Sequence, residues 1–573
     1  MYAIGHSVEV ENVTNLYFRD YYLKDFKYIG HEALRGNSGN VYKNANKLKG
    51  KGGAVTCQSL WKIWGREVLR GVKQFFYDGS LHGVRYIFEP TFSRKERAAW
   101  ILIVIISVAI CAVNIIQLVL KWTSTPFVNV LDSLPTPIWA VPFPTVILCP
   151  HLHVKLSFAN VSNLEGLDQL FASFVCPRLS SNKNISQHQL SPNENALLQN
   201  FIDKGSLKCT DIIKKCNWPA KHYINWVGRE CCDELFRPIF TEYGLCYAFN
   251  SLALNGMTND TLEWHKTFDN RATATKIKWN LDGGYPLMFP PDPKLQPLRV
   301  MVAGEAYGLG VELFLNNSEH QYACDGNSLG FTVLIRSPTD HAYTTTVLRL
   351  PMDKMTTIEV SPITYKTDTA LRNLHPELRQ CYFQNERKLE HFHFYTATNC
   401  KIDFYIQEAK LRCNCSLYYW PRKNIRDRIC STPIDYECVY KVKDIVTEQQ
   451  IFAYYDDCEE GKASKSSTTS CHPSCNEVMY GCQVFYSDLV KEPGDITPSW
   501  GKPIKGELTQ INVHFYEDMF LGQHRHTQYD DYYFVGAIGG LLSLFLGFSI
   551  ISVAELLYFV LLRPLYMILK KNY

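Results

Sequence analysis

Two long apolar runs near opposite ends of this 573-residue chain constrain its fold more than any other feature. Residues 98–120 contain no charged side chain, and residues 532–562 contain only one, Glu555. At about 1.5 Å rise per residue, a helix over the shorter run reaches about 35 Å, which is enough to cross a hydrocarbon core about 30 Å thick. We therefore predict two membrane-spanning helices rather than two buried core helices.

The distribution of positive charge predicts the orientation of these spans. Lysine and arginine are enriched on the cytoplasmic flanks of spans, and here they gather before the first run and after the second. The carriers are Arg85, Arg94, Lys95, Arg97, Arg563, Lys570 and Lys571. We expect residues 1–97 and the tail 563–573 to be cytoplasmic and residues 121–531 to be extracellular. The formal net charge of only +3 gives no support to a nucleic-acid-binding protein.

Cysteines and glycosylation acceptors agree with this topology. All 20 cysteines except Cys57 and Cys111 lie between Cys149 and Cys482, and an even number in an exported region predicts a disulfide framework. Asn-x-Ser/Thr acceptors also fall in this region. They are Asn160, Asn184, Asn259, Asn316 and Asn414. The predicted fold class is thus membrane α plus an α+β, disulfide-rich ectodomain.

Local patterns predict some of the remaining elements. Residues 331–337 and 511–520 have the alternating or β-branched pattern of strands, and residues 377–392 and 401–412 are interpreted as helices. Residues 58–77 predict an amphipathic helix, which either lies on the inner leaflet or packs within the protein.

The second apolar run carries the features that indicate function. Leaving Glu555 exposed to lipid costs on the order of 2.5–3.5 kcal/mol, so we expect it to face a water-filled path or a partner. Two spans cannot enclose such a path, which implies self-association. Gly536, Gly539, Gly540 and Gly547 allow close backbone approach or an interruption of the helix. The alternative for Gly536 and Gly540 is helix packing alone.

Other candidate sites remain open at this stage. Asp530 and Asp531 precede the second run, where they either form a ring of carboxylates that attracts cations or simply suit a solvated helix N-terminus. The pairs His151/His153, His391/His393 and His524/His526 have the spacing of metal ligands on a strand. We expect no metal site, because no Cys or Asp pair completes one in the sequence. Enzyme motifs and cofactor-binding loops are also missing, so we expect neither catalysis nor a cofactor.

The chain resembles the degenerin/epithelial sodium channel superfamily, and within it most closely the arthropod pickpocket branch. The resemblance covers about residues 80–565. Its carriers include LHGVRYI (81–87), FPTVILCP (143–150), TEYGLCYAFN (241–250), CHPSC (471–475) and GGLLSLFLGFSIISVAELLYF (539–559).

The resemblance implies a trimeric, voltage-insensitive, sodium-selective and amiloride-sensitive channel in the plasma membrane, with sodium as the permeant species. Related subunits are the implied partners, in homotrimers or heterotrimers. The tract Gly547-Phe548-Ser549 matches the family's selectivity position and Ser543 the position tied to amiloride block. His82-Gly83 matches the gating pair, and Gly536 the position where bulky residues hold such channels open.

The resemblance also implies a disulfide pairing. The implied bonds are Cys149–Cys246, Cys381–Cys475, Cys400–Cys471, Cys413–Cys438, Cys415–Cys430 and Cys216–Cys232, the last with Cys231 as the alternative partner. The pairing of the other cysteines stays open.

Two alternative functions remain open. Instead of a subunit that conducts sodium by itself, the chain could be an obligate auxiliary subunit of a heterotrimeric channel or a non-conducting surface receptor. Neither the residues nor the resemblance indicates whether the stimulus is chemical or mechanical.

Overall fold

The computed structural model describes residues 57–571 except 125–126, 177–178, 180–188, 192–193, 220–222, 253, 260–278, 287–291, 293–294, 342–346, 425–426, 461–470 and 491–506. The chain forms two compact units, Met1–Gln117 with Val535–Tyr573 and Leu118–Phe534. The predicted N-terminal tail before residue 57 and the acceptor Asn184 lie outside the described residues.

In its described residues the first unit contains helices and the turns between them, and no strand. Two of its helices, over Arg94–Thr123 and Ile550–Met567, are long and apolar enough to cross a membrane. Its elements are α3 (Cys57–Asp78), α4 (Val84–Phe88), α5 (Arg94–Ser124), α17 (Asp531–Leu546), α18 (Ile550–Leu557), the π-helical turn η7 (Tyr558–Leu562) and α19 (Arg563–Lys571), with α5 and α17 each reaching into the second unit.

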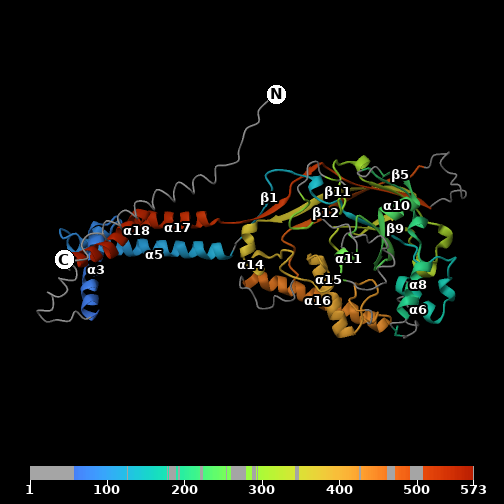
Figure 1. Ribbon diagram of the computed structural model, residues 1–573, viewed down its shortest axis with the longest axis horizontal. Helices are drawn as coiled ribbons and strands as arrows, with labels where there is room; N and C mark the ends of the chain where they lie inside the picture. Colours follow the sequence, from blue (N-terminus) through green and yellow to red (C-terminus); the bar gives the residue numbers. More distant parts are fainter. Residues whose placement is uncertain are drawn as a thin grey trace, which may run out of the picture. The chain divides into compact units, whose positions relative to one another are not determined.

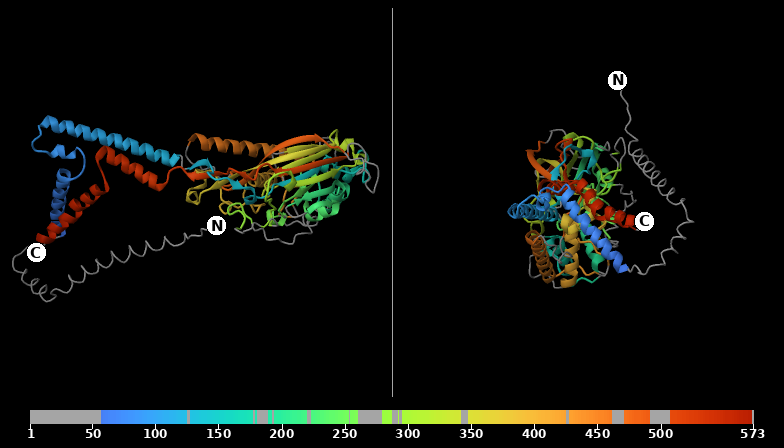
Figure 2. Two further views of the ribbon diagram at one scale, coloured as in Figure 1. Left: turned by 90° about the horizontal axis from the view of Figure 1, so that it is seen from above. Right: turned by 90° about the vertical axis from the view of Figure 1, so that its left-hand side faces the viewer.

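The second apolar run is not one continuous helix. α17 ends at Leu546, and α18 begins only after Gly547, Phe548 and Ser549. Gly547 has φ +64°, a left-handed conformation that costs a residue with a Cβ about 1–2 kcal/mol. The helix resumes because the Ser549 side chain accepts a hydrogen bond from the backbone N–H of Ser552 and so caps α18. Figure 2 shows the resulting bend between α17 and α18.

The helix predicted over residues 58–77 is present as α3, and it packs within the protein. Its buried Phe75 lies with its ring centroid 6.4 Å from that of Phe559 in η7. Gly71 allows this approach, because a Cβ there would lie 2.0 Å from the Phe559 carbonyl oxygen. α3 thus packs against the C-terminal part of the second apolar run, where the helix continues through α19 past the predicted end at Leu562.

The second unit is built on two main β-sheets. The larger has the order β1-β15-β11-β13-β8-β4-β5 with β12 added to β11, and the smaller has the order β10-β9-β3-β7-β6. The first sheet comprises β1 (Phe127–Leu131), β4 (Ile213–Trp218), β5 (Tyr223–Val227), β8 (Leu309–Phe314), β11 (Lys354–Thr367), β12 (Glu477–Asp488), β13 (Leu508–Phe515) and β15 (Gln523–Thr527). The second comprises β3 (Thr145–Pro150), β6 (Phe236–Thr241), β7 (Gly244–Phe249), β9 (Gly330–Arg336) and β10 (Val347–Pro351), and a third, two-stranded sheet pairs β2 (Thr136–Pro137) with β14 (Met519–Phe520).

An aromatic core joins the two main sheets. The Phe143 ring makes edge contacts with Trp218 at 4.9 Å and Phe515 at 5.3 Å between ring centroids. Phe249 of the smaller sheet packs against the same Trp218 at 4.9 Å. All four side chains are at most 1% exposed, so this cluster fixes the faces of β4, β7 and β13 that turn inward.

The second unit also contains helices outside its sheets. The elements are α6 (Gly166–Val175), α8 (Glu194–Gly205), α9 (Cys209–Ile212), α10 (Gly228–Glu234), α11 (Leu254–Met257), α13 (Tyr322–Asp325), α14 (Pro376–Arg379), α15 (Ala397–Cys413) and α16 (Pro433–Glu460), with short 3₁₀ turns at η1 (Ile138–Ala140), η2 (Val161–Asn163), η4 (Glu305–Tyr307), η5 (Asn317–Glu319) and η6 (Thr369–Asn373). α15 and α16 lie side by side in Figure 1 and share a buried apolar cluster.

The structure confirms most of the local predictions and contradicts one. The predicted strands at 331–337 and 511–520 overlap β9 and β13, and the predicted helix at 401–412 lies inside α15. The predicted helix at 377–392 is wrong, because α14 ends at Arg379, where Gln380 adopts a left-handed conformation with φ 55°. A single short turn of helix is therefore all that forms there.

Eight disulfides brace the second unit. Five of them are pairs that the family resemblance implies: Cys149–Cys246, Cys381–Cys475, Cys400–Cys471, Cys413–Cys438 and Cys415–Cys430. In the sixth, Cys216 bonds to Cys231, the alternative partner, and not to Cys232, which bonds to Cys209. Cys176–Cys324 is a further bond. Each bond is worth a few kcal/mol, about 2–4 in general.

Four of the predicted glycosylation acceptors are described, and none is buried. Asn160 and Asn316 each precede a short 3₁₀ helix, and each side chain accepts a backbone N–H from two residues further on. Asn414 ends α15 in a left-handed conformation, and Asn259 donates to the carbonyl of Glu390. Their use as glycosylation sites stays a prediction.

Candidate functional site

The helix break in the second span lies directly against a turn from the N-terminal region. The backbone N–H of His82 donates to the carbonyl of Leu546, the last residue of α17, at 3.1 Å. A Cβ on Gly547 would lie 2.4 Å from Nδ1 of His82, so the imidazole occupies the space that the glycine leaves open. Sequence patterns singled out His82 and Gly547 separately, and the structure brings them together.

The same turn provides a partner for the carboxylate within the span. The backbone N–H of Ser80 donates to Oε2 of Glu555 at 3.0 Å, and the hydroxyls of Ser80 and Ser552 lie 2.6 Å apart. Glu555 is therefore hydrogen-bonded within its own chain, which reduces the cost of a carboxylate in an apolar helix. Sequence reasoning missed Ser80 and Ser552, although the Ser549-x-x-Ser552 capping pattern was a signal for the latter.

Gly83 completes the turn by facing the first span. It has φ +78°, and a Cβ there would lie 3.3 Å from the Val104 side chain and 3.8 Å from the Trp100 ring, both on α5. The segment Ser80–Gly83 thus contacts α5, the end of α17 and α18 within one unit. A small movement of this turn would therefore change the contacts of both spans.

The glycine-bearing surface of α17 is open in the single chain. Among the described residues, nothing lies within 4 Å of a Cβ built on Gly536, Gly539 or Gly540. Apolar residues of the same helix are also exposed, with Leu544 77% accessible. An apolar helix with an unoccupied small-residue surface suits contact with another copy of the helix.

The remaining predicted residues lie near these elements. Ser543 accepts the backbone N–H of Gly547 through its carbonyl at 2.9 Å, and therefore helps to end α17. Phe548 donates its backbone N–H to the carbonyl of Leu542 at 3.3 Å. In the second unit, Asp530 and Asp531 are exposed at the start of α17, and Thr527 donates to the Asp530 carboxylate at 3.1 Å.

Comparison with known proteins decides the family. The model of a family described as "Amiloride-sensitive sodium channel" matches residues 75–559, which is most of the chain. The chain belongs to this family. Its relatives include Pickpocket protein 28 of Drosophila melanogaster, 24% identical, with 87% of this chain and 79% of the relative covered. Sodium channel protein Nach of the same species is 23% identical, with 87% of each covered. Acid-sensing ion channel 2 of Homo sapiens is 22% identical, with 85% of each covered.

Family membership confirms several expectations from the sequence. This amiloride-sensitive sodium channel family member is a plasma-membrane cation channel subunit and not an enzyme, and the pickpocket-like branch fits its relatives. Its two membrane-capable helices, large extracellular domain and cytoplasmic termini fit the family. Family members assemble as multimers with related subunits, and their permeant ion is sodium.

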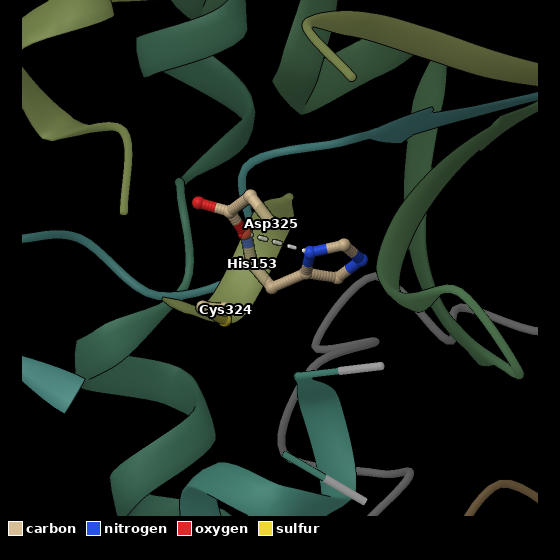
Figure 3. A group of neighbouring side chains, drawn as sticks. All are labelled: His153, Cys324 and Asp325. Carbon is tan, nitrogen blue, oxygen red and sulfur yellow. Dashed lines mark hydrogen bonds and ion pairs between the residues drawn. The ribbon is translucent and has the colours of Figure 1, made fainter. Parts of the chain in front are cut away.

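Three of the four histidines in the first two pairs make side-chain hydrogen bonds within the ectodomain. Burial and the nearby Arg349 guanidinium lower the pKa of His151 to about 4, which keeps this ring neutral at physiological pH. Nδ1 of His153 lies 2.9 Å from the Asp325 carboxylate, as Figure 3 shows. Cys324 beside them is bonded to Cys176 and offers no thiolate. His391 is likewise buried against Asp403 at 2.7 Å.

Glu477 should make the stability of the ectodomain depend on pH. Burial, reinforced by Asp340, raises its pKa from 4.5 to about 7, although Arg525 opposes the shift. Between pH 4.5 and about 7, Glu477 holds a proton in the folded state that it has lost in the unfolded state. The free energy of unfolding therefore falls as pH rises through this range, and this contribution to stability is lost completely above pH 7. The whole effect is about 3 kcal/mol at most.

Thermal unfolding of the purified chain at pH 5 and pH 8 tests this expectation. The Glu477→Gln variant should lose less stability than the wild type between the two pH values. An equal loss in the two proteins would show that Glu477 ionises normally in the folded state.

Proposed function

We propose that this chain is a subunit of a voltage-insensitive, sodium-selective channel that is sensitive to amiloride. It passes sodium passively when its ectodomain senses a chemical or mechanical stimulus. The observation that carries the proposal is the break at Gly547-Phe548-Ser549 with the His82-Gly83 turn seated against it. In this arrangement the helix is interrupted close to a hydrogen-bonded carboxylate, Glu555, within an otherwise apolar span.

The assembly that we propose is a trimer. One chain with two spans cannot enclose a path for ions, and the unoccupied glycine surface of α17 offers a contact between copies. In such an assembly the Gly547–Ser549 tract would narrow the pore and set selectivity. Asp530 and Asp531 would attract cations to its outer mouth, and Ser543 would lie where amiloride acts.

A bulky residue at Gly536 provides a test that needs no natural stimulus. We assign close packing of α17 against its copies in the trimer to the closed state. Gly536→Val should prevent this packing, because its side chain is branched, and should therefore give a persistent sodium current in whole-cell recordings. Amiloride should block this current. Gly481→Val, in strand β12 of the ectodomain, is the matched control and should leave cells silent, because a Cβ there would make only ordinary contacts at 3.7 Å or more.

Co-expression separates the alternatives. The variant is recorded alone and with a pickpocket-like subunit. Current only on co-expression would identify an auxiliary subunit, whereas surface expression without current in both settings would favour a non-conducting receptor.

A further inference from the structure

Three side chains at one end of the larger sheet offer metal-ligand atoms to a common point. One ligand atom from each of Asp368, His524 and His526 lies within 4.8 Å of the others. The two histidines alternate along β15, so their rings lie on the same face and stack with centroids 4.0 Å apart. Asp368 follows the end of β11 at Thr367, and β11 pairs in parallel with β15.

The Asp368 carboxylate is shared between the two rings. Its Oδ2 lies 2.7 Å from Nδ1 of His526, and its Oδ1 lies 3.6 Å from Nε2 of His524. In a tetrahedral zinc site with bonds of about 2.0–2.2 Å, ligand atoms lie about 3.3–3.6 Å apart. Small side-chain rotations would therefore bring these three groups to coordination distance.

A fourth residue orients one of the ligands. Nδ1 of His524 lies 3.4 Å from the carboxylate of Asp132, which leaves Nε2 of the same ring directed toward Asp368. A histidine that donates one ring N–H to a carboxylate and binds a metal through the other nitrogen is the usual arrangement in zinc sites. Gly522 permits this contact, because a Cβ there would lie 2.7 Å from Oδ2 of Asp132.

Access and charge also suit a cation. The side chains of His524, His526 and Asp368 are 27%, 42% and 39% exposed, and His524 and Asp368 line a cavity of about 680 Å³. Two carboxylates face the rings. Three cations also line the cavity: Arg299, Lys366 and Arg372. Arg372 pairs with Asp282, Arg299 donates to backbone carbonyls, and Lys366, which pairs with His524 in register, is exposed to solvent.

We propose that Asp368, His524 and His526 form a binding site for a divalent transition metal, with Zn²⁺ as the expected ion and Asp132 as a positioning residue. This revises the expectation from the sequence that no histidine pair finds its remaining ligands. Asp368 lies 156 positions before His524, and only the parallel pairing of β11 with β15 brings them together.

A bound ion would tie β15 to the end of β11. β15 ends at Thr527, four positions before α17 begins at Asp531. If the chain conducts as proposed above, this tie would alter gating. Binding itself does not depend on conduction and is tested without recording a current.

The test is calorimetric titration of Zn²⁺ into the purified, chelator-stripped full chain in lipid nanodiscs. We expect a site with one equivalent per chain. His526→Ala should weaken it at least about tenfold, and Asp132→Asn about 10–100-fold as loss of an orienting partner. His153→Ala is the matched control and should leave the affinity unchanged. The His153 ring also faces a carboxylate, that of Asp325, but the neighbouring Cys324 is in a disulfide and provides no metal ligand.

Cu²⁺ provides a second readout if a variant folds poorly. Its electron paramagnetic resonance spectrum on the wild-type chain should show coupling to two imidazole nitrogens. Zinc affinity that stays the same in the His524→Ala/His526→Ala double variant, or a Cu²⁺ spectrum without nitrogen coupling, would overturn the proposal.

Discussion

Gly547→Ala is expected to reduce the sodium current at least about tenfold, which corresponds to about 1.4 kcal/mol. Two independent effects act against the alanine. The backbone at this position is left-handed, with φ +64°, and the added methyl would lie 2.4–2.7 Å from three atoms of the His82 ring. Either the helix break changes shape or the turn that carries His82 is displaced, and both alter the narrow part of the proposed pore.

A control in another helix separates this effect from a general intolerance of bulk. Gly65 lies at an exposed position within α3, and nothing described in the chain lies within 4 Å of a Cβ built there. Gly65→Ala should therefore keep the current within about twofold, on the usual scale for surface substitutions. Both variants are recorded in the Gly536→Val background, with surface labelling to correct for expression.

A double variant tests whether His82 carries part of the effect. Removing the imidazole by His82→Ala relieves the contact but leaves the left-handed backbone. The two substitutions together should therefore cost less than the sum of their separate effects, by about 0.5–3 kcal/mol as for residues in contact. Strict additivity would mean that the His82 turn and the helix break act separately.

The elements that the sequence predicted best are those with a local cause. The two apolar runs marked the spans, and Gly547 marked the break, because glycine alone adopts the left-handed conformation without a steric cost. The turn around His82 could not be placed in the same way. Its hydrogen bonds to Leu546 and Glu555 join residues more than 460 positions apart, and no local pattern records such a contact.

The choice of partner for Cys216, left between Cys231 and Cys232 by the sequence, also depends on tertiary structure. Cys231 and Cys232 are neighbours in α10, where successive side chains point about 100° apart. Each can therefore reach a different partner, and the choice depends on where α10 lies against β4. The family resemblance supplied the bond to Cys216 but not the second bond, Cys209–Cys232, that competes for the same pair.

Arg379→Met is expected to destabilise the ectodomain by about 3–5 kcal/mol, because it removes a buried guanidinium with a full set of partners. The side chain is 0% exposed. It donates to the carbonyls of Leu371, Arg372, Leu374 and Cys381 and pairs with the carboxylate of Glu386. Methionine fills a similar space but removes the arginine donor from all five acceptors. The Leu371 carbonyl and the Glu386 carboxylate keep one backbone N–H each, from Leu374 and Phe383.

The position of Arg379 explains why this loss of stability should also lower the amount of protein at the cell surface. Its own carbonyl accepts a hydrogen bond from Arg525 of β15 at 3.1 Å, and Cys381, two residues on, bonds to Cys475. Arg379 therefore organises the segment between β11, β15 and a disulfide. We expect Arg379→Met to be largely retained inside the cell and the purified chain to unfold at a clearly lower temperature.

Two further variants serve as controls for the loss of the Arg379 guanidinium. Arg412→Ala removes a half-exposed arginine whose partner is Glu408 one helical turn away, an interaction worth about 0.3–0.5 kcal/mol, and should reach the surface normally. Arg379→Lys keeps the charge but not the planar set of five donors, so it should rescue little. An Arg379→Met chain that matched the wild type in surface level and unfolding temperature would contradict the expectation. It would show that the four carbonyls and the Glu386 carboxylate are satisfied without the guanidinium.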